Sequence, residues 1–166
     1  MKRTILLALW ALIIQGCASP YQKHGIGGGY SETQLDENVF KVSFRGNGYT
    51  QRERVEDFTL LRSAELALEH GYQYFAVIDD NSYTSHSTYT TPTHSYTTGS
   101  AYVYGNSVYG SATTTTTGGQ TYLISKPSSS NTIVCFKEKP QGVFVYNANF
   151  IFKNIRQKYE LDSSKK

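Results

Sequence analysis

The stretch VSFRGNGYTQRERVED (residues 42–57) marks a change from a strand pattern to a helix pattern. Around its start, Phe40, Val42 and Phe44 alternate with polar residues, which predicts a half-buried strand. From Arg52 onward the apolar residues recur at helical spacing, as Val55, Phe58, Leu61, Ala64 and Leu68. We expect the helix to end at Gly71, because glycine suits the left-handed position that follows many helices.

The glycines between this strand and this helix have two interpretations. Gly46 and Gly48 could cradle a phosphate at a helix N-terminus. The dinucleotide fingerprint, however, requires a third glycine where Gln51 stands, and no Gly-Lys-Ser/Thr follows, which excludes a P-loop. Asn47-Gly48 is typical of a turn, and Thr50 with Glu53 three residues later predicts a capping box. We therefore interpret R-G-N-G as a turn.

The rest of the pattern predicts an α+β fold. Residues 72–78 predict a more buried strand, and the helix before it is long enough for parallel pairing of the two flanking strands. Residues 122–124 and 133–136 predict two short strands joined by a loop, and 143–146 predict another. We expect a small mixed or antiparallel sheet with two helices, at about residues 50–70 and 147–160, the second capped by Asn147. These elements form a single domain over residues 39–160, followed by a frayed tail at 161–166.

The N-terminus predicts export. Lys2 and Arg3 precede an apolar run over residues 5–14, which is shorter than the roughly 20 residues that span a bilayer. The run closes with Ile14-Gln15-Gly16-Cys17, which resembles the bacterial lipobox, although Gln15 departs from its usual small or apolar residue. The resemblance implies a signal peptide at residues 1–16 and fatty acyl chains, including palmitate, on Cys17, anchoring the chain without spanning the membrane. An ordinary secretory signal with an incidental cysteine is the alternative.

Sorting, charge and cysteine content follow from this cleavage. Ala18 beside the acylated cysteine implies transfer to the outer membrane. Removing Lys2 and Arg3 leaves 14 basic against 13 acidic side chains, and this balance gives no reason to expect a nucleic-acid partner. With Cys17 acylated, Cys135 is the remaining thiol, and its place within an apolar strand favours a buried, inert role. The glycine-rich residues 18–29 predict a flexible tether, within a lipidated N-terminal region at 17–38.

Residues 81–125 contain no Asp, Glu, Lys or Arg, and residues 81–120 form a low-complexity Tyr/Thr/Ser/Gly insertion. This composition favours disorder or a mobile loop, and a long β-hairpin is the alternative because the segment is uncharged and β-prone. Tyrosine offers a rigid amphipathic surface. The candidate binding residues are therefore Tyr83, Tyr89, Tyr96, Tyr102, Tyr104 and Tyr109, unless the segment is only a solvated spacer.

No other group of residues predicts catalysis. The histidines of the insertion lack neighbouring metal ligands, so we expect neither a metal site nor a cofactor. Asp79-Asp80 is more typical of the polar end of a strand than of a catalytic pair. The charged residues of the first helix, Arg62 and Glu65 among them, predict a solvated surface with local ion pairs.

Several segments resemble a family of proteobacterial envelope lipoproteins. They are Gly28–Glu32, Phe40–Asn47, Arg54, Glu56-Asp57, Leu60–Arg62, Ala64-Glu65, Gly71–Phe75 and the strand around Cys135, which together with their surroundings cover roughly two thirds of the mature chain. The resemblance implies a small α+β domain in the cell envelope and no established reaction. We expect a non-enzymatic, lipid-anchored protein of the periplasmic or surface face that contacts protein or glycan partners, with no small-molecule substrate. The alternative is an envelope stress or surface sensor that signals through a partner.

Overall fold

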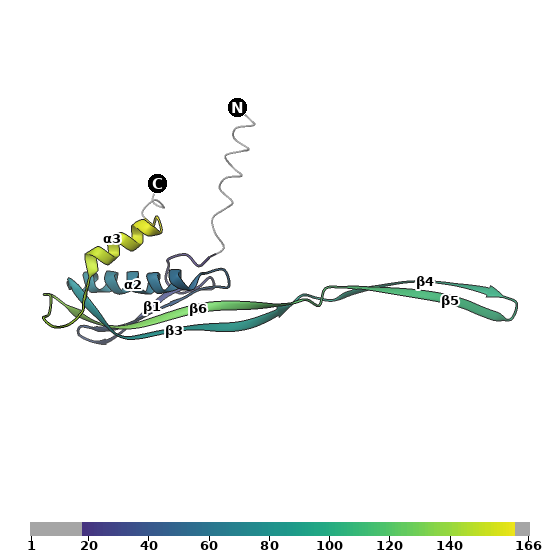
Figure 1. The fold of residues 1–166 in the computed structure, drawn as a ribbon, viewed down its shortest axis with the longest axis horizontal. Coiled ribbons are helices and arrows are strands. Elements are labelled where there is room, and N and C mark those ends of the chain that lie inside the picture. The colour runs from purple at the N-terminus through teal and green to yellow at the C-terminus, as the bar shows by residue number, and fades with distance from the viewer. Residues whose placement is uncertain (1–17, 162–166) are drawn as a thin grey trace, which may run out of the picture. The chain divides into compact units, whose positions relative to one another are not determined.

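The computed structural model describes residues 18–161 (Figure 1). Within them the chain forms two compact units. The first contains the residues up to Ser85 and from Ser125 onward, and the second is His86–Ile124. The two long strands β3 (Tyr74–Thr90) and β6 (Thr121–Phe136) begin in one unit and end in the other.

The first unit is an antiparallel sheet with two described helices, which confirms the predicted α+β class. The sheet order is β1-β2-β6-β3-β7, where β1 is Gly29–Asp36, β2 is Val39–Arg45 and β7 is Tyr146–Asn147. The helices are α2 (Arg52–Glu69) and α3 (Ala148–Lys158), close to their predicted positions. None of the described helices is long and apolar enough to cross a membrane.

The strands that flank α2 do not pair with each other, contrary to the pairing that we considered. β6 lies between β2 and β3 and runs antiparallel to both. β6 is also one continuous strand, so the loop predicted between residues 124 and 133 is wrong. Its small residues Ser128–Ser130 fit between neighbouring strands, where Ser129 is almost fully buried. Proline has no N–H to donate to a neighbouring strand, and Pro127 lies just beyond the Arg45–Ser128 pair that ends the β2–β6 register. Its carbonyl accepts a hydrogen bond from Gly46 N at 2.9 Å.

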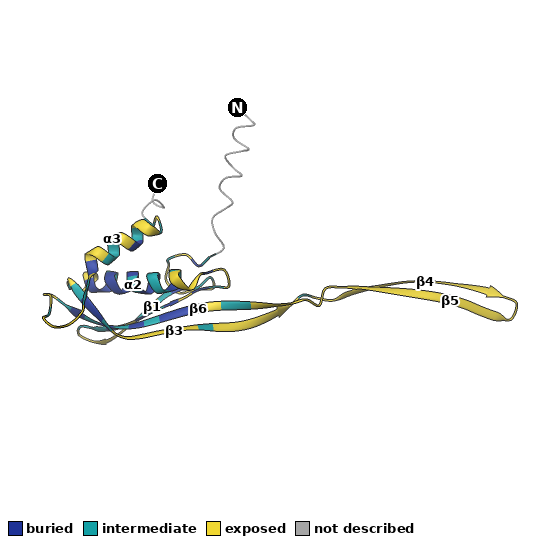
Figure 2. Ribbon diagram, in the orientation of Figure 1, coloured by how far each residue is buried: buried dark blue, intermediate teal, exposed yellow. Residues whose placement is uncertain are grey.

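The core lies between the sheet and α2, and α3 packs on α2 (Figures 1 and 2). As predicted, Phe40, Val42 and Phe44 are buried, and so are Val55, Phe58, Leu61 and Ala64 of α2. Because α2 has a neighbour on two sides, its buried surface is wider than one apolar stripe and includes Thr59, Arg62 and Ser63. Leu68, which the pattern placed in the core, is instead 36% exposed.

Of the three helix ends for which the sequence carries a capping signal, two match the prediction. At the end of α2, Gly71 has a φ of +78°, Tyr72 N donates to Ala67 O and Gly71 N donates to Leu68 O, which is a Schellman motif. Asn147 caps α3 by accepting from Phe150 N at 2.9 Å, and Ala148 begins the helix as expected. The capping box at the start of α2 is wrong: the N-cap is Gln51, which makes no side-chain capping bond.

The second unit contains a two-stranded antiparallel hairpin, so the disorder favoured by composition is wrong and the hairpin alternative is correct. β4 (His94–Tyr104) pairs with β5 (Ser107–Thr117) without a register shift. The connecting turn is Gly105-Asn106, and Gly105 has the positive φ of 63° that two-residue hairpin turns require. The segment is ordered because its Thr, Tyr and Val residues favour strands and its backbone groups pair across the hairpin.

Candidate functional site

The N-terminal segment is folded onto the first unit, which corrects the expected tether. Ser19 is fully buried. Its N–H donates to Thr50 Oγ1 at 2.9 Å, its Oγ donates to the Gly27 carbonyl, and its Oγ also accepts from Asn47 N at 2.9 Å. We call the contacts among Ser19, Asn47 and Thr50 the N-terminal clasp. They explain the absent capping box, because the Thr50 hydroxyl serves the clasp instead of α2.

The R-G-N-G turn therefore holds the chain's own N-terminal segment. In and just after this turn, four backbone N–H groups are occupied within the protein: Gly46 N by Pro127 O, Asn47 N by the clasp, Tyr49 N by Asn47 Oδ1 and Thr50 N by Asn47 O. A phosphate cradle needs N–H groups that converge on free space. The interpretation of this segment as a structural turn is consistent with these contacts.

Two residues after Ser19, Tyr21 extends this packing. Its ring centroid lies 5.1 Å from that of Tyr30 and 5.2 Å from that of Phe58. Its hydroxyl donates to Glu65 Oε2 at 2.5 Å. Burial, together with the Glu65 carboxylate, raises the pKa of Tyr21, so its hydroxyl keeps its proton.

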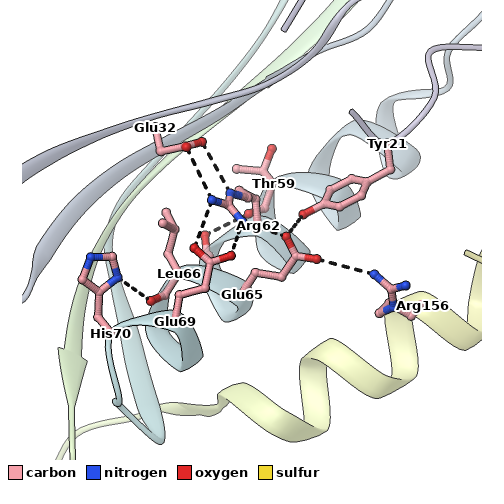
Figure 3. Close-up of polar contacts among 10 residues, drawn as sticks. Tyr21, Glu32, Thr59, Arg62, Glu65, Leu66, Glu69, His70 and Arg156 are labelled. Carbon is pink, nitrogen blue, oxygen red and sulfur yellow. Dashed lines mark hydrogen bonds and ion pairs between the residues drawn. The ribbon is translucent and has the colours of Figure 1, made fainter. Parts of the chain in front are cut away.

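An ion-pair cluster around Arg62 joins β1 to α2 (Figure 3). The Arg62 guanidinium lies 3.4 Å from Glu32, 3.0 Å from Glu65 and 2.8 Å from Glu69. It also stacks over the Tyr30 ring at 4.8 Å. Burial alone would lower the pKa of Arg62, but hydrogen bonds to Glu69, Glu65 and Glu32 outweigh it and the pKa is raised. Glu65 lies 3.7 Å from Arg156, which extends the cluster to α3.

This cluster is structural. The Arg62 side chain is only 10% exposed and its donors already meet three carboxylates, so little of its charge is available to an external ligand. The sequence placed Arg62 and Glu65 on a solvated surface. No signal in the helical spacing distinguishes them from exposed charged residues, because their burial depends on Tyr21 and β1, which are distant in the sequence.

The candidate tyrosines fall into two groups. Tyr102 and Tyr109 are cross-strand partners in the hairpin, with stacked rings 5.7 Å apart. Because side chains alternate along a strand, Tyr96 and Tyr104 share their face. All four are more than half exposed, and no charged residue accompanies them. Tyr89 lies on β3 within the same unit, whereas Tyr83 belongs to the first unit.

The remaining candidates do not form a reactive centre. Cys135 is 1% exposed on the core side of β6, as predicted, and burial raises the pKa of its thiol to about 12. Asp79 accepts from Asn81 Nδ2 at 2.8 Å on the exposed part of β3. Among residues 18–161, no group of three His, Cys, Asp or Glu is arranged to hold a metal ion. Cys17, the predicted lipidation site, lies outside the described residues.

Comparisons of the chain with protein-family models, with curated proteins and with solved structures found no match. The resemblance to envelope lipoproteins therefore stays a prediction from the sequence.

Proposed function

We propose that this chain is a lipid-anchored cell-envelope protein of the non-enzymatic interaction type, which contacts a protein or glycan partner. The observation that carries the proposal is the position of Cys17. It closes the apolar N-terminal run in a lipobox-like sequence, and the folded unit begins two residues later at the buried Ser19.

Ser19 follows Cys17 by only two positions in the sequence, and this short separation determines how such an anchor would act. Two residues span at most about 7 Å even when fully extended. An acylated Cys17 would therefore hold the N-terminal clasp at the lipid surface, with no linker between them.

Two exposed side chains next to the clasp suit this position. Ile26 precedes Gly27, whose carbonyl bonds to Ser19, and Tyr49 lies in the turn that holds Ser19. Both are strongly exposed, at 111% and 76%. An aliphatic side chain and a tyrosine are favourable at the boundary between lipid headgroups and acyl chains. We place this loop pair against the membrane.

The tyrosine face of the hairpin supports the second part of the proposal. Tyr96, Tyr102, Tyr104 and Tyr109 give contact area at a low entropic cost, and the uncharged segment has no electrostatic barrier to a neutral partner such as a glycan. Cys135, the thiol that a nucleophilic mechanism would use, is buried and protonated, which supports interaction rather than catalysis.

Membrane fractionation of cells tests the anchor. We expect the chain to remain with membranes after an alkaline wash. The Cys17→Ala variant should become soluble, because it has no cysteine to carry the proposed acyl chains. Cys135→Ala is the matched control and should stay with the membranes. If Cys17→Ala remained in the washed membranes, the anchor proposal would be wrong.

A further inference from the structure

Each strand of the hairpin has one free edge. β4 and β5 form a two-stranded sheet, so each strand has a single neighbour among the described residues. Both strands are exposed along their whole length, as Figure 2 shows. A free strand edge presents backbone N–H and C=O groups that can pair with a further strand. The hairpin therefore offers backbone hydrogen bonds in addition to its tyrosine face.

The register identifies the backbone groups that lie at the β5 edge. Tyr104 and Ser107 flank the two-residue turn and form a hydrogen-bonded pair in such a hairpin, and bonded and non-bonded pairs alternate from there. The Thr97 and Thr114 hydroxyls meet at 2.8 Å, which fits the closer side chains of a non-bonded pair. Residues of the non-bonded pairs direct their N–H and C=O outward. On β5 they are Val108, Gly110, Ala112, Thr114 and Thr116.

The larger sheet of this chain, in contrast, has protected edges. At one edge, β1 carries the charged Glu32 and Asp36, and its register shifts between Gln34 and Asp36. At the other edge, β7 has only two residues. Charge, irregular register and short length prevent edge-to-edge pairing between chains. β5 has none of these features, because it extends over 11 residues without a charged residue, a proline or a register shift.

We propose that the β5 edge pairs with the β5 edge of a second copy of this chain, antiparallel about a twofold axis at Ala112. Identical strands match along their full length in this arrangement, so the outward groups from Val108 to Thr116 all find partners. On the tyrosine face, Tyr109 lies opposite the second copy's Thr115, which is a favourable pair of an aromatic and a β-branched residue. No charged side chain of either strand opposes the approach.

β5 suits this pairing better than β4 does. Residues 113–117 of β5 are consecutive threonines, which favour strands. The same arrangement on β4 would set Gly99 against Gly99 at the axis, where glycine weakens a strand, and β4 begins at the ionisable His94. The β5 edge is also distinct from the tyrosine face. The pairing of two copies therefore does not depend on the partner proposed for that face.

Sedimentation velocity of the full chain in a density-matched detergent tests the pairing, because it counts the copies in each particle. We expect dimers that dissociate on dilution. Thr114→Pro removes an outward N–H of β5, and Thr97→Pro removes an outward N–H of β4. The two variants are matched, because both lose the same hydroxyl contact between Thr97 and Thr114. Thr114→Pro should weaken dimerisation by at least about tenfold, and Thr97→Pro should leave it unchanged.

A charge exchange at the axis keeps the test decisive if a proline disturbs the hairpin. Ala112→Lys and Ala112→Asp each place two like charges opposite one another, so each variant alone should be monomeric. Mixing the two variants should restore the dimer, because opposite charges then face each other. The proposal is wrong if the unmodified chain is monomeric at every concentration, if Thr114→Pro and Thr97→Pro have the same effect, or if the mixture stays monomeric.

Discussion

Among single residues, Arg62 joins two elements of the first unit through three ion pairs. It connects Glu32 of β1 with Glu65 and Glu69 of α2, and Glu65 in turn holds the Tyr21 hydroxyl. Its side chain is 10% exposed, as against 67% for Arg52 on the same helix. Arg62 therefore fixes the N-terminal segment and the edge strand to the first helix.

We expect Arg62→Ala to lower the free energy of unfolding by about 3 kcal/mol, because it leaves the half-buried Glu65 carboxylate without its nearest cation. Urea denaturation measures this change. Arg52→Ala is the control. Its exposed pair with Glu56 should contribute only about 0.5 kcal/mol. Equal losses for the two variants would contradict the structural role of Arg62.

Cys135 allows a second test at this scale. In a Cys17→Ser chain Cys135 is the only thiol, and we expect it to resist alkylation at pH 8 and pH 10 in the folded protein but to react in denaturant. Its folded pKa of about 12 lies above the ordinary value of 9.0. The folded state therefore holds the proton more tightly, and this contribution to stability is complete below pH 9 and lost as the pH rises through 12. Rapid alkylation of the folded protein at pH 8 would show that the thiol is exposed.

At the scale of elements, what the sequence predicts depends on whether the signal is local. The periodicity of Phe40–Phe44 and of α2 is local, as are the Gly71 and Asn147 signals at the helix ends, and these predictions were confirmed. β1 was missed because a polar edge strand needs no apolar alternation, and its pairing with β2 is its main stabilisation. Thr50 could not be excluded as a cap, since its partner Ser19 is 31 residues away.

The candidate site shows the same limit. The tyrosines and their uncharged surroundings were evident in the sequence, but the stacking of Tyr102 on Tyr109 depends on the register of β4 and β5. The composition of the hairpin segment favoured disorder because it lacks the aliphatic residues to build a core. The hairpin needs no aliphatic core, because its order comes from backbone pairing and from glycines at its turns.

The hairpin turn gives the prediction at this scale. Gly105→Val places a β-branched residue at a φ of 63°, which should destabilise the β4–β5 pairing near the turn. We expect faster cleavage of residues 94–117 by elastase. The melting temperature of the first unit should not change, because the hairpin lies in the other unit.

Asn106→Ala is the control for this variant, since Asn106 occupies the same turn without a positive φ. Its cleavage rate should stay close to that of the unmodified chain. Rapid cleavage of the unmodified chain itself would mean that the hairpin is not ordered in solution.

At the scale of the whole molecule, the proposed anchor and the N-terminal clasp together define a membrane-facing surface on the first unit. Ser19 is buried two residues after Cys17, and the loops of Ile26 and Tyr49 both meet at Ser19. Lipid attachment would thus place the domain at the bilayer instead of on a tether. The sequence alone favoured a tether because residues 18–29 are rich in glycine.

Tryptophan fluorescence tests this placement. Trp10 precedes the expected cleavage site, so Ile26→Trp would be the only tryptophan of the mature chain. In vesicles, we expect its emission to shift to the blue and to be quenched by brominated lipids, because the side chain enters the acyl boundary. Phe150→Trp, at an exposed position of α3, should show neither effect. Equal quenching at both positions would contradict a specific membrane-facing surface.

Photo-crosslinking in cells from the hairpin of the full chain tests whether the tyrosine face contacts a partner. A photoreactive amino acid is placed at Tyr102 or at Tyr109, and at Phe150 as an exposed aromatic control in the first unit. We predict that both hairpin positions form the same discrete adduct with a protein or glycan and that Phe150 does not. No adduct from either hairpin position, or the same adduct from Phe150, would contradict a contact surface formed by the tyrosines.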